Sequence, residues 1–285
     1  MRPFQLIVSA DDFGLSSEVN GAVIRAFQEG VLTSCSLMVT GEAFDEAVLL
    51  AKKHPGLAVG LHLMTVCGRP VLPPSEIPSL VDCSGHFPSS ATIAGLKYFL
   101  SRRARSELRR ELAAQFQKFH ATGLPFSHID GHLHMHVHPF IFRTAIQLGL
   151  DYGVKRMRVP NDDLSLALRF DRSSIVKKFV HAGIFSLLSR FMKNRLRVNG
   201  FLFADRVYGL FQTGKMNEAY FLEVIRGLDR PSNEIYFHPA LDRGQLSEPA
   251  QSEVELNALT SPKVVELFNR LDIRRINYLQ LGLAR

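Results

Sequence analysis

Short apolar segments alternate with longer segments of helical periodicity along most of the chain, and this alternation constrains the fold more than any other feature. Strands are expected at 6–10, 36–40, 57–63, 126–131, 156–159, 201–204, 234–237 and 276–279, and helices at 18–29, 43–53, 105–121, 139–150, 217–228 and 262–271. This order predicts a parallel sheet with right-handed crossovers. About seven to eight mostly parallel strands favour an α/β fold of the distorted (β/α) barrel type, with an open sheet as the alternative.

The size and composition of the chain fit one globular unit. α/β barrels commonly reach 285 residues around one core, so a single domain over 1–285 is expected. With 46% hydrophobic and 21% charged residues, the chain is not of the disordered class. No leader or membrane span is expected, and the three cysteines (Cys35, Cys67 and Cys83) lack paired spacing, which indicates reduced thiols in a cytoplasmic protein. Cys35 is expected in a buried strand.

The net charge of +7 is concentrated in one segment. Between Arg169 and Arg197 there are eight basic residues and one acid, interleaved with apolar residues near helical spacing. This pattern predicts a basic amphipathic insertion at about 165–200, of the kind that lies on an anionic membrane surface. A helix packed on its own domain is the alternative, and nucleic acid is not expected because no recognised motif accompanies the charge. The expected membrane contacts are Lys177, Lys178, Phe185, Phe191, Lys193 and Arg195.

Polar, titratable residues stand where several predicted strands end. Asp11 and Asp12 follow the first strand, His62 ends the third, and His132 and His134 follow the fourth, with His238 after a late strand. The carboxyl ends of parallel strands share one edge, where such folds carry their sites. We therefore expect these groups to converge, although an aspartate before a helix can also serve only as a cap.

The segment 127–138 has a polar titratable group at every second position, including five histidines. Strand periodicity would place all of them on one face. Imidazole is a good ligand for zinc, nickel, cobalt and iron, so this segment predicts a transition-metal site. One ion cannot take every histidine, so some are expected to contact ligands or substrate instead.

Several motifs together resemble a known family over nearly the whole chain. They are Ala-Asp-Asp-Phe-Gly-Leu-Ser at 10–16, Val-Gly-Leu-His-Leu at 59–63, His-Ile-Asp-Gly-His-Leu-His-Met-His at 128–136 and Phe-His-Pro at 237–239. In order and spacing they resemble the signature blocks of the YdjC-type carbohydrate deacetylases. Within that family, the segments 68–74 and 234–240 resemble the hopanoid-biosynthesis-associated deacetylases (HpnK).

The resemblance implies roles for individual residues. One divalent metal ion would be held by Asp12, His62 and His132; zinc is expected first, with magnesium, cobalt or nickel as alternatives. Asp11 would be the general base and His238 would protonate the departing amine, with Arg158 orienting the base. Asp130 would orient a ligating histidine, and His134 would reach the site as a substrate contact or ligand support.

The resemblance also implies a substrate: an N-acetylglucosaminyl group on bacteriohopanetetrol. Because this lipid stays in the membrane, a cytoplasmic enzyme is expected to act peripherally at the cytoplasmic face of the inner membrane. A soluble chitooligosaccharide deacetylase would use the same metal site and is the first alternative. Another metal-dependent amidohydrolase or phosphoesterase is disfavoured because the first strand lacks a His-x-His pair, and a non-catalytic metal-binding module would need neither Asp11 nor His238. The segment 68–100, rich in Pro and Ser, is expected to be a long loop of the kind that often forms lids. The sequence carries no signal for the oligomeric state.

Overall fold

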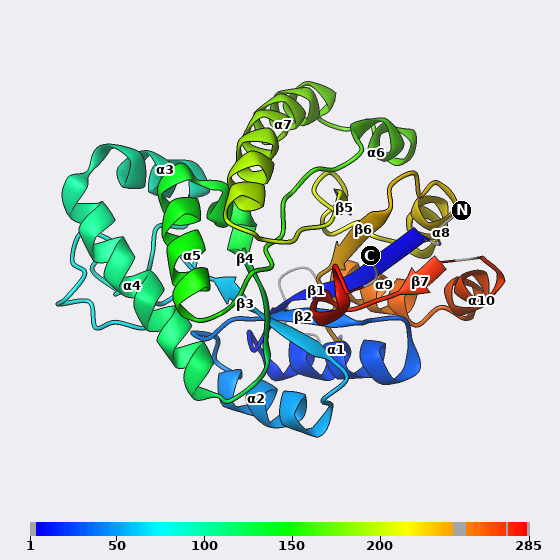
Figure 1. The fold of residues 1–285 in the computed structure, drawn as a ribbon, viewed down its shortest axis with the longest axis horizontal. Helices are drawn as coiled ribbons and strands as arrows, with labels where there is room; N and C mark the ends of the chain where they lie inside the picture. Colours follow the sequence, from blue (N-terminus) through cyan, green and yellow to red (C-terminus); the bar gives the residue numbers. More distant parts are fainter. Residues whose placement is uncertain (1–3, 242–248, 272, 284–285) are drawn as a thin grey trace.

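The protein is built on one curled parallel sheet, seen in a computed structural model that describes residues 4–241, 249–271 and 273–283 (Figure 1). Its main strand order is β4-β3-β2-β1-β6-β5, and β7 pairs with the start of β1. The strands are β1 (Phe4–Phe13), β2 (Ser34–Leu37), β3 (Ala58–Leu63), β4 (Phe126–Gly131), β5 (Arg206–Tyr208), β6 (Ser232–Phe237) and β7 (Ile273–Arg275). Cys35 is buried within β2, as predicted.

An irregular segment continues the sheet beyond β4 and gives it a barrel-like form. Ile129 of β4 bridges to Met157, and Arg156 bridges to Leu202. Further along, the amide of Val207 in β5 donates to the carbonyl of Asn161 at 3.2 Å. The strands predicted at 156–159 and 201–204 are therefore present only as isolated bridges; Pro160, which lacks an amide hydrogen, directly follows the first of them. The predicted distorted barrel-like α/β fold is confirmed.

Most predicted helices occur within a few residues of their expected bounds. They are α1 (Ser17–Glu29), α2 (Phe44–Lys53), α4 (Arg102–Ala121), α5 (Pro139–Asp151), α8 (Glu218–Arg226) and α10 (Pro262–Arg270). In α1 the buried positions Val19, Val23 and Ala26 recur at helical spacing, and Ser16 caps the first turn by accepting from the amide of Val19. α9 (Pro249–Leu259) was not predicted.

The strand predicted at 276–279 is wrong. β7 ends at Arg275, and Tyr278–Gln280 forms the short 3-10 helix η2. The cause is local: the Asn277 side chain accepts from the amide of Gln280 while the Gln280 side chain accepts from the amide of Asn277. This reciprocal capping box starts a helical turn where apolar content alone suggested a strand.

The long segment after β3 is only partly the loop expected from its composition. Its first part is fastened to α4: Glu111 accepts from the amides of Val71 and Leu72, each at 2.9 Å, and Glu107 accepts from the amide of Ser79 at 2.8 Å. Its last part forms the helix α3 (Ala91–Leu100). Because its backbone donors are held by buried carboxylates, residues 71–79 are anchored.

The basic insertion is helical, as α6 (Leu164–Phe170) and α7 (Ile175–Val198), which run along the upper margin of Figure 1. α7 packs through Ser189, Met192 and Leu196 in its second half, while its first half is largely exposed. Among the residues that the structure describes, no helix is long and apolar enough to cross a membrane.

Four of the six residues expected to contact a membrane are engaged by the protein itself. Lys178 pairs with Asp171 at 3.0 Å, and the ammonium of Lys193 donates to the carbonyl of Asp205 at 2.7 Å. The ring of Phe191 packs against Phe142, and Phe185 lines a cavity. Only Lys177 and Arg195 of the predicted set are exposed. The sequence located the helix, but a helical period alone did not show which side faces the protein.

Candidate active site

Two adjacent aspartates at the end of β1 reach the same site because the backbone leaves the regular strand there. Successive residues of a strand normally point to opposite faces. Here the pairing of β1 with β2 shifts between Ala10 and Phe13, and Asp12 has a left-handed φ of 63°. A non-glycine residue in this region is strained, which is typical of functional positions. The distortion lets Asp11 face the sheet interior while Asp12 faces the histidines of β3 and η1 (His132–Val137).

The three residues expected to bind metal lie together. Asp12 Oδ1 is 3.2 Å from His62 Nε2 and 3.0 Å from His132 Nδ1. The other ring nitrogen of His62 is held by Asp130 Oδ1 and by the Ser36 hydroxyl, each at 2.9 Å. One carboxylate and two imidazoles fit a divalent ion with open positions, and a carboxylate behind a ligating histidine is the usual support. The donor set therefore fits a metal site, and Asp11, His62 and Asp130 form a second group that could hold an ion.

The protonation states of Asp12 and His62 depend on each other. Burial opposes ionisation of Asp12, but hydrogen bonds with His132 and His62 hold the pKa of Asp12 well below its usual value. Burial also opposes protonation of His62, but the charge of Asp130 and the hydrogen bond with Asp12 raise the pKa of His62 to about 10. Without a cation, the proton on His62 neutralises the surrounding carboxylates.

Metal uptake should therefore release a proton from His62. Below the His62 pKa of about 10 the proton competes with the cation, so we expect affinity to rise about tenfold for each pH unit toward that value. Zinc titration calorimetry in buffers of different ionisation enthalpy would measure the released proton. His62→Ala should abolish uptake, whereas His54→Ala, at the end of α2, should leave it unchanged. Uptake without pH dependence would contradict this protonation state.

The guanidinium of Arg158 is fully buried and binds three carboxylates of the site. Arg158 holds both oxygens of Asp11, at 2.6 and 2.8 Å, and also contacts Asp130 at 2.8 Å and Glu234 at 2.9 Å. Its planar fork fits such bidentate contacts. Burial would lower the pKa of Arg158, but Asp11 and the other two carboxylates raise it well above the usual value. The arginine is therefore a permanent cation that fixes the orientation of Asp11.

His238 lies on the other side of Asp11. Its Nε2 is 4.0 Å from Asp11 Oδ2, and its backbone amide donates to the buried carboxylate of Glu255. The ring is partly exposed to the cavity and follows directly after β6. Asp11 and His238 are thus close enough to act on one substrate, as the convergence of strand ends predicts.

The prediction that the 127–138 histidines share one face is wrong. β4 ends at Gly131, and the chain coils into η1 with left-handed φ at Leu133 and His134. His132 faces Asp12, while His134 Nε2 lies 2.8 Å from the Tyr236 hydroxyl. The remaining three are directed elsewhere: His128 stacks on Tyr278, His136 Nε2 is 3.2 Å from the carbonyl of Arg158, and His138 lies beside Tyr98 and Phe99.

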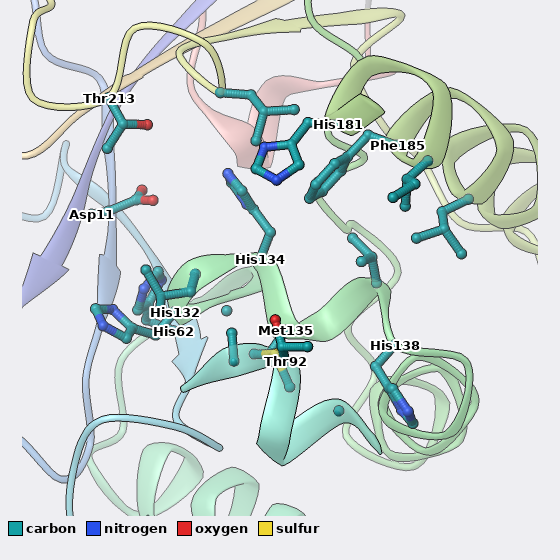
Figure 2. Close-up of a pocket in the computed structure, with 18 of the residues that line it drawn as sticks. Asp11, His62, Thr92, His132, His134, Met135, His138, His181, Phe185 and Thr213 are labelled. Carbon is teal, nitrogen blue, oxygen red and sulfur yellow. The ribbon is translucent and has the colours of Figure 1, made fainter. Parts of the chain in front are cut away.

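A cavity of about 660 Å³ opens over this cluster. Figure 2 shows Asp11, His62 and His132 at one end, with His181 and Phe185 of α7 on the far side of His134. The remaining wall is mainly apolar and comes from α3, η1, α5 and α7 and the segment after β5, including Ala91, Gly95, Val137, Pro139, Ile184, Leu188 and Leu210. The cavity therefore joins a polar reaction centre to an apolar chamber.

Several residues of the site were not singled out from the sequence. Ser36 supports His62, Tyr236 contacts His134, and Glu234 binds Arg158. Glu234 carried a usable signal, because it is the one charged residue in the strand Ser-Asn-Glu-Ile-Tyr-Phe. A charge is rarely buried in a strand unless it is paired. Ser36 and Tyr236 carried no comparable signal.

The curled parallel sheet, with an Asp-His-His cluster and a carboxylate–arginine pair at its carboxyl edge, defines a barrel-like α/β protein with a candidate metal-assisted hydrolytic site. Residues 5–270 match the family model described as YdjC-like protein. The chain belongs to the YdjC-like family.

Named relatives and a solved structure agree with this placement. A carbohydrate deacetylase of Brevibacillus brevis is 34% identical, with 98% of this chain and 100% of the relative covered. A chitooligosaccharide deacetylase of Salmonella newport is 38% identical over 58% of this chain and 65% of its own length. A crystal structure described as a cellobiose-phosphate cleavage protein of Enterococcus faecalis superposes with a TM-score of 0.73 and 25% identity, covering 97% of this chain and 98% of that one.

Proposed function

We propose that this carbohydrate deacetylase, a hydrolase of amide bonds, removes the acetyl group from an N-acetylglucosaminyl group carried by a hopanoid lipid. Deacetylation itself is supported by the family and by the relatives' names. The lipid substrate is supported by the resemblance at 68–74 and 234–240 and, above all, by the apolar chamber beside Asp11. A polar aglycone would not match the apolar side chains of Ile184, Phe185 and Leu188 that line this chamber.

The residues around the cavity can divide the proton transfers of amide hydrolysis. A divalent cation held by Asp12, His62 and His132 would polarise the acetyl carbonyl and make a water molecule more acidic. Asp11, oriented by Arg158, accepts the proton of the attacking water as the new carbon–oxygen bond forms. His238 donates a proton to the nitrogen as the carbon–nitrogen bond breaks, since an unprotonated amine leaves poorly. The products are acetate and the glucosamine form of the substrate.

A soluble chitooligosaccharide is the second candidate substrate. The specific observation in its favour is the likeness to the chitooligosaccharide deacetylase of Salmonella, which extends over 58% of this chain. The same catalytic residues would serve either substrate. The difference between them lies in what fills the apolar chamber.

The chamber can be tested by comparing two acetylated substrates. We expect Phe185→Ser to lower kcat/KM for detergent-dispersed N-acetylglucosaminyl bacteriohopanetetrol about tenfold, because a lost apolar contact of this size is worth about 1–3 kcal/mol. Turnover of di-N-acetylchitobiose should change little. Val198→Ser, exposed at the far end of the same helix, is the matched control. Amine release would be measured for both. Turnover of the soluble sugar alone would favour the second candidate, and turnover of neither would contradict deacetylation of these sugars.

A further inference from the structure

We propose that α3 and the first half of α7 form a docking surface that seats the mouth of the active-site cavity on an anionic lipid bilayer. The reason for this protein to bind a lipid bilayer rests on the proposed function. The evidence for the surface itself is independent of turnover. It consists of apolar side chains directed away from the protein, the lack of acidic residues in the segments 83–106 and 172–204 that carry them, and their position on both sides of the cavity.

The first half of α7 has an apolar stripe on its outer side. Val176, Val180 and Leu187 are 55–73% exposed and recur at positions that share one face of a helix. The opposite face, with Ser189, Met192 and Leu196, is buried against the protein. A surface helix is normally apolar only toward its core, and a helix apolar on both sides is typical of a buried or membrane-associated element. The stripe therefore calls for a partner outside the chain.

α3 repeats this arrangement on the other side of the cavity. Ile93, Leu96 and Leu100 are spaced as one helical face and are 55–70% exposed, and Phe99 beside them is also exposed. Ala94 and Tyr98 form the buried face. Single exposed apolar residues are common, but groups of three or four exposed apolar residues on each of two helices mark an interaction surface.

The two helices flank one opening. Ala91, Thr92 and Gly95 of α3 and His181, Ile184 and Leu188 of α7 line the same cavity. Figure 2 shows Thr92 at one side of this cavity and the α7 residues His181 and Phe185 at another. On each helix the lining positions adjoin the exposed apolar stripe. A flat lipid surface that contacted both stripes would face the cavity mouth, so a membrane-held sugar could reach Asp11 without leaving the bilayer.

The charge around these stripes fits an anionic surface. No acidic residue occurs between Cys83 and Ser106 or between Arg172 and Ala204, whereas these two segments carry four and seven lysines and arginines. Arg102, Arg172 and Lys177 are exposed beside the apolar residues. Cations near an apolar patch attract anionic lipid headgroups by about 1 kcal/mol each. This charge favours lipid over a second copy of the chain, which would bring like charges together.

The chain contains no tryptophan, so a single introduced tryptophan reports its own surroundings. Leu100→Trp and Val176→Trp should show a blue-shifted emission with vesicles of phosphatidylcholine mixed with phosphatidylglycerol, and little shift with pure phosphatidylcholine. Leu49→Trp, an equally exposed position on α2, is the matched control and should not shift. A shift at Leu49, or an equal shift with neutral vesicles, would overturn the proposal.

Vesicle sedimentation of the full chain tests the apolar contacts and the basic residues of this surface separately. Val176→Ser/Val180→Ser/Leu187→Ser should abolish pelleting, and Arg102→Glu/Lys177→Glu should weaken it at least about tenfold. Lys52→Glu/Lys53→Glu on α2 makes the same charge change away from the cavity and should have no effect. No pelleting of the wild type would overturn the proposal even if deacetylation is observed. A lipid-independent dimer lost in the triple variant would replace it with self-association, and neither result depends on the substrate.

Discussion

Arg158→Met should lower the free energy of unfolding by about 3–5 kcal/mol and abolish deacetylation, because it leaves uncompensated buried charge. Asp11, Asp130 and Glu234 all lie within 3 Å of this one guanidinium, and none of the three has more than slight exposure. Without it, these carboxylates repel one another in a dry environment. Urea unfolding monitored by circular dichroism would give the stability, and amine release would give the activity.

Arg156→Met is the matched control for this change. Arg156 is two residues away and half-buried, and its side chain donates to the carbonyl of Leu279. Its loss should cost no more than about 1–2 kcal/mol. Arg158→Lys keeps the charge but cannot reproduce the bidentate contact with Asp11, so it should recover stability better than activity. Wild-type stability of Arg158→Met would contradict the assigned role.

Asp11→Asn should lower kcat by about 10²- to 10⁴-fold while leaving metal uptake intact, since the amide matches the carboxylate in shape but cannot accept the proton. Asp12→Asn should instead lose both metal and turnover, because Asp12 faces both histidines. Metal content by atomic absorption, measured beside turnover, separates the two outcomes. If Asp11→Asn also loses the metal, the ion is held by the alternative group of Asp11, His62 and Asp130.

The regular helices and strands of the fold could be predicted from the sequence. Strand and helix positions followed from periodicity, and the convergence of Asp11, His62 and His238 followed from the geometry of parallel strands. The predictions failed where the backbone leaves the regular conformation that the hydrophobic period of a strand indicates. The left-handed residues Leu133 and His134 turn the histidine run into a coil, and a capping box replaces the last predicted strand. No pattern in a single sequence distinguishes these cases from regular strands.

The contacts of Arg158 were beyond sequence reasoning for a different reason. They join residues separated by as many as 147 positions, so they depend on tertiary packing. The outward apolar stripe of α7 was missed because an amphipathic pattern indicates a helix without fixing which side is covered. Lys193 and Phe191 were therefore assigned to a membrane although they face the protein.

The pairing of β1 has a consequence for the order in which the chain can mature during synthesis. β1 is the first strand made, yet it lies at the centre of the sheet and pairs with β6 and β7, which are made last. Asp11 depends on Arg158, and Arg158 on Glu234, whose other oxygen accepts from the Tyr278 hydroxyl. In a nascent chain β1 therefore lacks its partners β6 and β7 until residues 232–275 have been made, and a chain truncated before β6 would lack Glu234, which holds Arg158 beside Asp11.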